Sequence, residues 1–513
     1  MNLIKSLLSA LAVAVLIPQL VAGPALAADP SSASNRNIWS VDTGGLAYQN
    51  GLLLNHGSPC TNGFDTCSAD AGLTVVNDLA PCEPQSVIAC IASVEASTDG
   101  TNWVPGVYQG ARAASWPYYA FPAHPELGIG AANQSNLYTF DGISHDQGNL
   151  FEVNPWMQAE IQTGQPISIT QISTKVTGVV NDPVPNVAFT QHVVGQSGAE
   201  WLATMSNCLV DFTQSTTCWR TTKQTTPVSF RVSLALPSQP SGWVTGRLTA
   251  PSVQFGNEQT NQDLPYQVTV AGGSVTTPAV SASYFQDNSA DFDMWNKLAG
   301  QFTGMDWSPN SMGTALSPTD IDRFLAMAAI DPNINKATFQ TDEWVSNLSW
   351  APSQPAGVGC AAPSGFAGFV GSNALVFSSA VPTFNPSTGS LDYRIAAPHR
   401  LPDGTVLSGK YSLLLDEAYA KCIWGVTGSI GTPTVTVTDS DPTVTSPTVN
   451  FVNTNGFVQI DVSGFNFSNV HIATKFGVVK KTVKTTKCMF KKNHKKTKTV
   501  KGSKCPTGWV KKK

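Results

Sequence analysis

The residues best suited to chemistry in this chain are lysines, and they are concentrated near its C-terminal end. From Lys475 to Lys513 the sequence contains 15 of the 30 Lys and Arg residues and no Asp or Glu. Lysine is a compact charge that binds phosphate and other anions without requiring a fixed geometry. The pattern predicts electrostatic binding of an anionic surface by Lys491, Lys492, Lys495, Lys496, Lys498, Lys501 and Lys504.

The rest of the chain carries the opposite charge. Residues 1–474 contain 15 Lys and Arg against all 34 Asp and Glu, a net charge of −19. The expected partner of the lysine segment is an anionic cell-wall polymer or another polyanion, with carbohydrate as a second candidate. The segment has no Arg and few aromatic residues, which disfavours sequence-specific nucleic-acid binding. Two alternatives stay open: a solvated, mobile charge block, or a segment folded back on the acidic body.

A second candidate binding feature is a short run of aromatic residues held between two prolines. Exposed rings of this kind stack on the faces of sugars or anchor a protein partner. Burial in a hydrophobic core is the more common use of aromatic side chains. The candidate ligand-stacking residues are Trp116, Tyr118, Tyr119 and Phe121.

Common catalytic motifs are absent from the sequence. It contains no H-E-x-x-H, no G-x-S-x-G and no glycine-rich phosphate loop, so no metal and no cofactor is expected. The preferred interpretation is a non-catalytic cell-envelope or adhesion-type protein. The alternative is a hydrolase acting on polysaccharide or peptide, which needs two carboxylates about 5–9.5 Å apart or a nucleophile–base pair. Its undifferentiated candidates are Glu95, Asp99, Asp342 and Glu343.

The cysteines indicate an oxidising compartment. There are ten, an even number, and no C-x₂-C pair that would suggest a zinc site. Close neighbours along the chain suggest five disulfides, although the sequence alone does not determine the connectivity. The suggested pairs are Cys60/Cys67, Cys82/Cys90, Cys208/Cys218, Cys360/Cys422 and Cys488/Cys505.

Residues 1–27 have the features of a cleavable signal peptide. One lysine, Lys5, precedes an apolar run of eleven residues from Leu7 to Ile17, and the segment ends in Ala25-Leu26-Ala27. The apolar run is too short to span a bilayer, which needs roughly 20 residues. We therefore expect export, to the extracellular space or the cell wall, with no transmembrane segment after cleavage.

Alternating apolar residues predict a mainly β fold, α+β overall, built from sandwich-like sheets. The clearest strand covers 228–236, and others are expected at 242–248, 266–270, 434–438 and 457–462. A small helical section is expected in the middle of the chain. Ser317 and Pro318 begin one helix that Asp331 and Pro332 end, and weaker helical patterns cover 291–302 and 411–424.

These patterns divide the chain into five parts. A β-rich region over 28–285 follows the signal peptide, and a mixed α/β region follows over 286–425. A small β module is expected at 426–474, before a flexible Lys-rich tail at 475–513.

Several segments resemble those of uncharacterised secreted proteins of Gram-positive actinobacteria that carry a Lys-rich, Cys-containing C-terminal tail. The similarity lies in the residues 94–103, 242–248, 397–404, 411–415, 420–425 and 488–513. The resemblance implies a secreted protein that faces the cell envelope. It implies no particular activity and no site residues.

Overall fold

Strands make up most of the computed structural model, in agreement with the mainly β expectation. The structure describes residues 38–43, 51–55, 58–59, 72–84, 86–112, 123–131, 135–162, 164–183, 189–192, 200–204, 208–211, 214–256, 264–285, 288–299, 318–349, 359–360, 365–377, 381–438, 447–454, 456–467, 469–478, 485–501 and 504–512. The proposed signal peptide and the aromatic run at 116–121 therefore lie outside the described residues.

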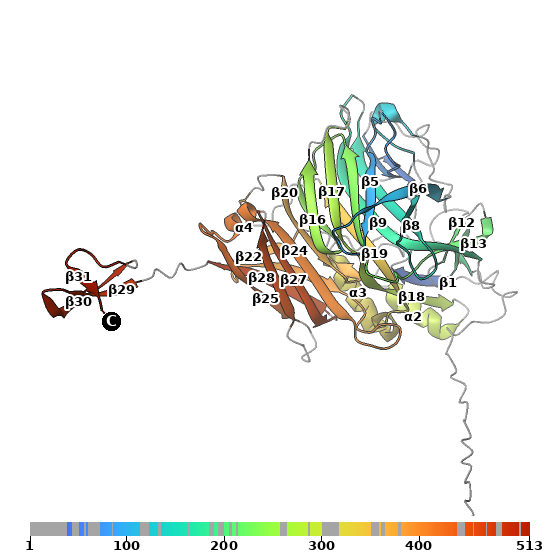
Figure 1. The fold of residues 1–513 in the computed structure, drawn as a ribbon. Coiled ribbons are helices and arrows are strands. Elements are labelled where there is room, and N and C mark those ends of the chain that lie inside the picture. Colours follow the sequence, from blue (N-terminus) through green and yellow to red (C-terminus); the bar gives the residue numbers. More distant parts are fainter. Residues whose placement is uncertain are drawn as a thin grey trace, which may run out of the picture.

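Ten strands form one continuous sheet, here called the central sheet (Figure 1). All neighbouring strands in it are antiparallel except β15 and β20, which run parallel. In order across the sheet they are β6 (Val104–Arg112), β7 (Ser135–Phe140), β8 (Leu150–Ile161), β9 (Ser168–Pro183), β19 (Phe339–Ser349), β15 (Gly242–Arg247), β20 (Phe366–Ser372), β24 (Ser408–Asp416), β27 (Phe457–Asn466) and β26 (Thr448–Thr454).

Further strands extend this sheet at three places. They are β4 (Leu73–Asp78), β2 (Gly51–Asn55) and β3 (Ser58–Pro59) next to β8; β13 (Gln214–Thr221), β12 (Cys208–Asp211), β11 (Glu200–Thr204) and β10 (Phe189–His192) next to β9; and β18 (Val275–Phe285) and β1 (Ile38–Thr43) next to β19.

A second layer of strands covers one face of the central sheet. Its order is β5 (Cys90–Ser97), β14 (Ser229–Leu236), β17 (Tyr266–Gly273) and β16 (Thr249–Gly256). Alternate residues of β14, such as Phe230 and Val232, share a buried core with Val244 and Phe369 of the central sheet. This sheet-on-sheet packing is the sandwich arrangement expected from the sequence.

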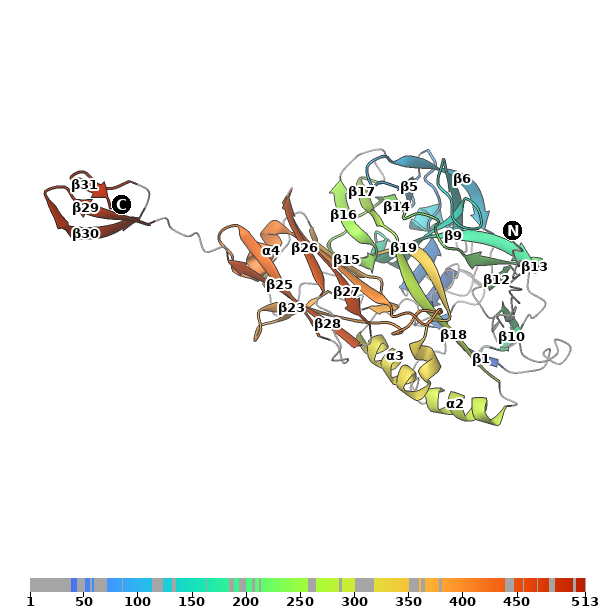
Figure 2. The same cartoon turned by 60° about the horizontal axis from the view of Figure 1, so that its bottom comes forward.

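A third layer covers the opposite face, at the end of the central sheet that runs from β15 to β27 (Figure 2). It combines a small sheet with three helices, and its core includes Trp243, Val370 and Leu413 of the central sheet. Its elements are β21 (Val376–Phe377), β22 (Thr383–Asn385), β23 (Ser390–Ala396), β28 (Asn469–Val478), β25 (Ile430–Thr438), α2 (Ser289–Ala299), α3 (Pro318–Ile330) and α4 (Glu417–Ile423).

Two of the strands in the region that begins at residue 426 pair with strands that precede this region in the chain. In this region β28 pairs with β23, and β27 pairs with β24. The segment therefore contributes strands both to the central sheet and to the third layer.

The prediction of a helix over 411–424 is wrong in its first half. Residues up to Asp416 belong to strand β24, and only Glu417–Ile423 is helical. The apolar run Leu413–Leu415 has no period-2 alternation because both faces of β24 are buried: Leu413 packs into one core and Leu414 into the other. Asp416 then starts the helix, since its carboxylate accepts the backbone N–H of Tyr419 at 2.8 Å.

The other expected elements are present. The clearest predicted strand is β14, whose predicted inward residues are buried, and α3 begins at Pro318 as predicted. It ends before Asp331, whose side chain accepts the backbone N–H of Asn333.

Three of the expected disulfides form. They join Cys82 to Cys90, Cys360 to Cys422 and Cys488 to Cys505. Cys60 and Cys67, and the side chains of Cys208 and Cys218, lie outside the described residues. Within the described part of the chain, no helix has both the length and the apolar character needed to cross a bilayer.

The lysine segment, which the sequence suggested would be flexible, contains a three-stranded antiparallel sheet, here called the lysine module. Its strands are β29 (Thr485–Phe490), β30 (Asn493–Lys501) and β31 (Trp509–Lys511), with β29 in the centre. Among the described strands these three pair only with one another (Figure 1). The Cys488–Cys505 disulfide closes the fold.

Candidate functional site

The lysine module presents its charges to solvent. Six of the seven lysines predicted to bind an anionic surface are exposed, and the side chain of the seventh, Lys501, lies outside the described set. The exposed six are Lys491, Lys492, Lys495, Lys496, Lys498 and Lys504. With no acidic residue after 474, none of these charges has a carboxylate partner on the module itself. The module can therefore create a strong positive potential around a folded framework.

A small group of side chains holds the module together. Cys488 of β29 is fully buried, and the rings of Phe490 and Trp509 pack with their centroids 5.2 Å apart. The Lys498 ammonium lies 4.4 Å from the centroid of the Trp509 ring, a cation–π contact. The disulfide and this ring pair explain why a segment so rich in like charges can fold.

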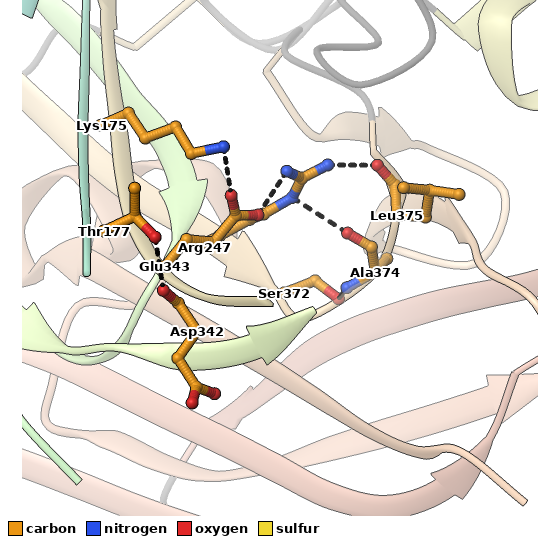
Figure 3. Close-up of polar contacts among 8 residues, drawn as sticks. All are labelled: Lys175, Thr177, Arg247, Asp342, Glu343, Ser372, Ala374 and Leu375. Carbon is orange, nitrogen blue, oxygen red and sulfur yellow. Dashed lines mark hydrogen bonds and ion pairs between the residues drawn. The ribbon is translucent and has the colours of Figure 1, made fainter. Parts of the chain in front are cut away.

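The body of the protein contains a different cluster of charges, which lies inside it. The carboxylate of Glu343, on β19, is completely buried and forms ion pairs with two side chains, one from each strand that flanks β19 (Figure 3). Lys175 Nζ of β9 lies 2.8 Å from Oε2, and Arg247 Nη1 of β15 lies 2.6 Å from Oε1. Arg247 also donates to the carbonyl oxygens of Ala374, at 3.1 Å, and Leu375.

This cluster continues across the central sheet. Arg112 of β6 donates from Nε to Glu152 Oε2 of β8 at 2.7 Å, and both side chains are buried. Thr177 of β9 stands opposite Glu152 on one side and opposite Glu343 on the other, so these residues share one face of the sheet. Five charged side chains from five strands thus lie on one face of the sheet as two ion-paired groups, here called the buried charge ladder: Arg112 with Glu152, and Lys175 and Arg247 with Glu343. Four of the five are buried, and the side chain of Lys175 is 15% exposed.

The electrostatics of the ladder suit a structural role and not acid–base catalysis. Burial alone would raise the pKa of Glu343, but Lys175 and Arg247 outweigh burial and lower that pKa to about 2. A catalytic acid needs a pKa near the working pH, which Glu343 does not have. The ladder lies on the face of the central sheet that the third layer covers further along, from β15 to β27. This face is therefore charged at one end of the sheet and apolar at the other.

The remaining candidate carboxylates are engaged in local contacts. Glu95 pairs with Arg231 at 3.0 Å, and Asp342 accepts the backbone N–H of Gln224 at 2.8 Å. Asp99 shapes the hairpin between β5 and β6, where the backbone N–H groups of Asn102 and Thr101 lower the pKa of its carboxyl group. Within the described residues, no group of three or more His, Cys, Asp or Glu side chains is arranged to hold a metal ion.

The imidazole of His145 is a further buried titratable group. Its Nε2 donates to the Leu150 carbonyl at 2.9 Å, and its Nδ1 accepts the backbone N–H of Gln147 at 3.2 Å. Both contacts fit a neutral ring with the hydrogen on Nε2. Burial lowers the pKa of His145 below its ordinary value of 6.5.

We expect this histidine to make the protein less stable as the pH falls below about 6.5. The unfolded chain takes up a proton there, while the native state holds His145 neutral to a lower pH. The urea midpoint of the wild type should therefore drop between pH 7 and 5.5 by more than that of His145→Gln, whose amide can still donate to Leu150. Identical pH dependence of the two proteins would contradict this assignment.

Comparison of the chain with protein-family models, with curated proteins and with solved structures found no match in any of the three.

Proposed function

We propose that the protein is a secreted, non-catalytic component of the cell envelope, or an adhesion-type protein, that attaches to an anionic surface polymer through the lysine module. The observation that carries this proposal is the module itself. It is a disulfide-closed sheet with exposed lysines, and it has no acidic residue. A folded cationic framework keeps its charges concentrated when it meets a polyanion, which favours electrostatic capture.

The charge of the remaining chain supports a defined orientation on such a surface. Residues 1–474 carry a net charge of −19, so an anionic surface repels them while it attracts the module. Attachment through the module then leaves the body projecting outward. The disulfides are compatible with export, because such bonds persist mainly in oxidising compartments.

The test compares binding of four proteins to purified cell-wall envelopes over a salt series. The first is the full chain, and the second lacks residues 479–513, because β28 extends to Val478 and Phe476 is buried in the body. The third has the six exposed lysines replaced by glutamine, and its matched control replaces the same six by arginine.

We expect the full chain and the arginine control to bind, and the other two proteins to lose retention. If about four lysines contact the polymer, counterion release predicts a slope near −3 in log K against log salt. Affinity should then fall roughly 50-fold between 50 and 200 mM salt. Equal retention of the full chain and the truncated protein, or retention that is indifferent to salt, would exclude the proposal.

A further inference from the structure

Lysines project from both faces of the module. On one face, Lys498 and Lys511 stand in a single cross-strand row on either side of Cys488. On the other face, Lys487 stands opposite Thr499 in the neighbouring row. Lys498, Lys511 and Lys487 are all exposed. A flat surface such as a lipid bilayer can contact only one face of a small sheet, whereas a flexible chain can reach both.

The aromatic rings of the module are already engaged. Phe490 and Trp509 are partly buried and pack on each other. The ammonium of Lys498 lies over the ring of Trp509. Binding of single-stranded nucleic acid relies on open rings on which successive bases stack. In the described part of the module no Phe, Trp or Tyr ring is free of such contacts, since Phe490 and Trp509 are the only residues of these three types from 485 on.

The type of cationic side chain in the module indicates which class of anion it binds. The guanidinium of arginine binds carboxylate and phosphate groups in a planar, bidentate geometry, while the ammonium of lysine binds phosphate as a point charge without that geometry. Every cationic residue after 474, apart from His494, is lysine.

From these three observations we infer that the module binds a flexible, linear polymer of phosphodiester-linked units without bases, and that one polymer chain contacts lysines on both faces of the sheet. This inference depends on the proposed function and specifies the ligand of the same site. The ligand class follows from the two-faced lysines, the occupied rings and the absence of arginine.

The experiment measures binding of the full chain to four probes at 50 mM salt, with the protein lacking residues 479–513 as baseline. The probes are deacylated poly(glycerol phosphate), an oligo(dT) with the same number of phosphates, poly-glutamate, and vesicles of phosphatidylglycerol and phosphatidylcholine. We expect the tightest binding to poly(glycerol phosphate). Lys498→Gln with Lys511→Gln tests one face and Lys487→Gln tests the other, with Lys498→Arg as the charge-retaining control.

Each lysine removed should weaken poly(glycerol phosphate) binding about five-fold on either face, and the arginine control should bind normally. Tighter binding to oligo(dT), poly-glutamate or vesicles, or sensitivity confined to one face, would overturn the inference and leave the proposed function standing. If no probe binds above the baseline, both the inference about the ligand and the proposed function are wrong.

Discussion

Replacing Glu343 by glutamine is expected to destabilise the protein by about 3–5 kcal/mol, the range for breaking a buried ion pair. The carboxylate is fully buried and holds Lys175 at 2.8 Å and Arg247 at 2.6 Å. Without it, Lys175 and Arg247 would both lose the buried carboxylate that they share. Chemical denaturation with urea, followed by fluorescence, measures the difference in the free energy of unfolding.

The matched control is Glu95→Gln, which breaks an ion pair to Arg231 at the protein surface. Those two side chains are 26% and 31% exposed, so the expected loss is below about 1 kcal/mol. A Glu343→Gln variant as stable as Glu95→Gln would show that the buried ladder does not hold the sheet together.

A third variant separates the charges from the packing. Lys175→Met, Arg247→Met and Glu343→Leu together remove the three charges around Glu343 and leave the Arg112–Glu152 pair in place. This triple variant should lie closer to the wild type in stability than Glu343→Gln does, because both cations are removed together with the carboxylate. Because the pKa of Glu343 is lowered to about 2 from 4.5, the stabilisation from its charge is present above pH 4.5. It should disappear as the pH falls from 4.5 towards 2.

The second large effect is expected from the Cys360–Cys422 disulfide. It joins residues 62 positions apart, and the Cys82–Cys90 disulfide joins residues 8 apart. In the chain-entropy model the longer loop contributes about 4 kcal/mol and the shorter about 2.5 kcal/mol. Cys360→Ala with Cys422→Ala should therefore lower the urea midpoint more than Cys82→Ala with Cys90→Ala.

The two double variants are compared with the wild type under oxidising and reducing conditions. Under reducing conditions all three proteins lose their remaining disulfides, so the differences in stability between them should shrink. If removing the short-loop disulfide costs as much as removing the long-loop one, loop closure does not account for the stabilisation.

The sequence alone predicted those elements whose residue pattern directly reflects the local structure. The alternation at 228–236 follows the strand β14, and Pro318 followed by Asp320 gives the start of α3. Sequence reasoning failed at 411–416, because a strand buried on both faces has the same apolar run as a buried helix.

The buried charge ladder could not have been found in this way. Glu343 was one of four candidate catalytic carboxylates that the sequence could not distinguish, and Arg112, Glu152 and Lys175 belong to no motif. Their partners lie 40 to 168 residues away along the chain, so only the register of the central sheet brings them together. The fold of the lysine module was also missed, since the block of like charge conceals the Thr and Val residues of β30 and the pairing of Phe490 with Trp509.

The two-sided character of the central sheet also limits how this sequence can change during evolution. Lys175 faces the ladder, and its neighbour Val176 faces the apolar core shared with the second layer. Loss or gain of one residue within β9 would exchange these faces for the rest of the strand, placing an ammonium group in the core. Homologous chains should therefore vary in length within β9 only in steps of two residues, or carry a β-bulge that restores the alternation.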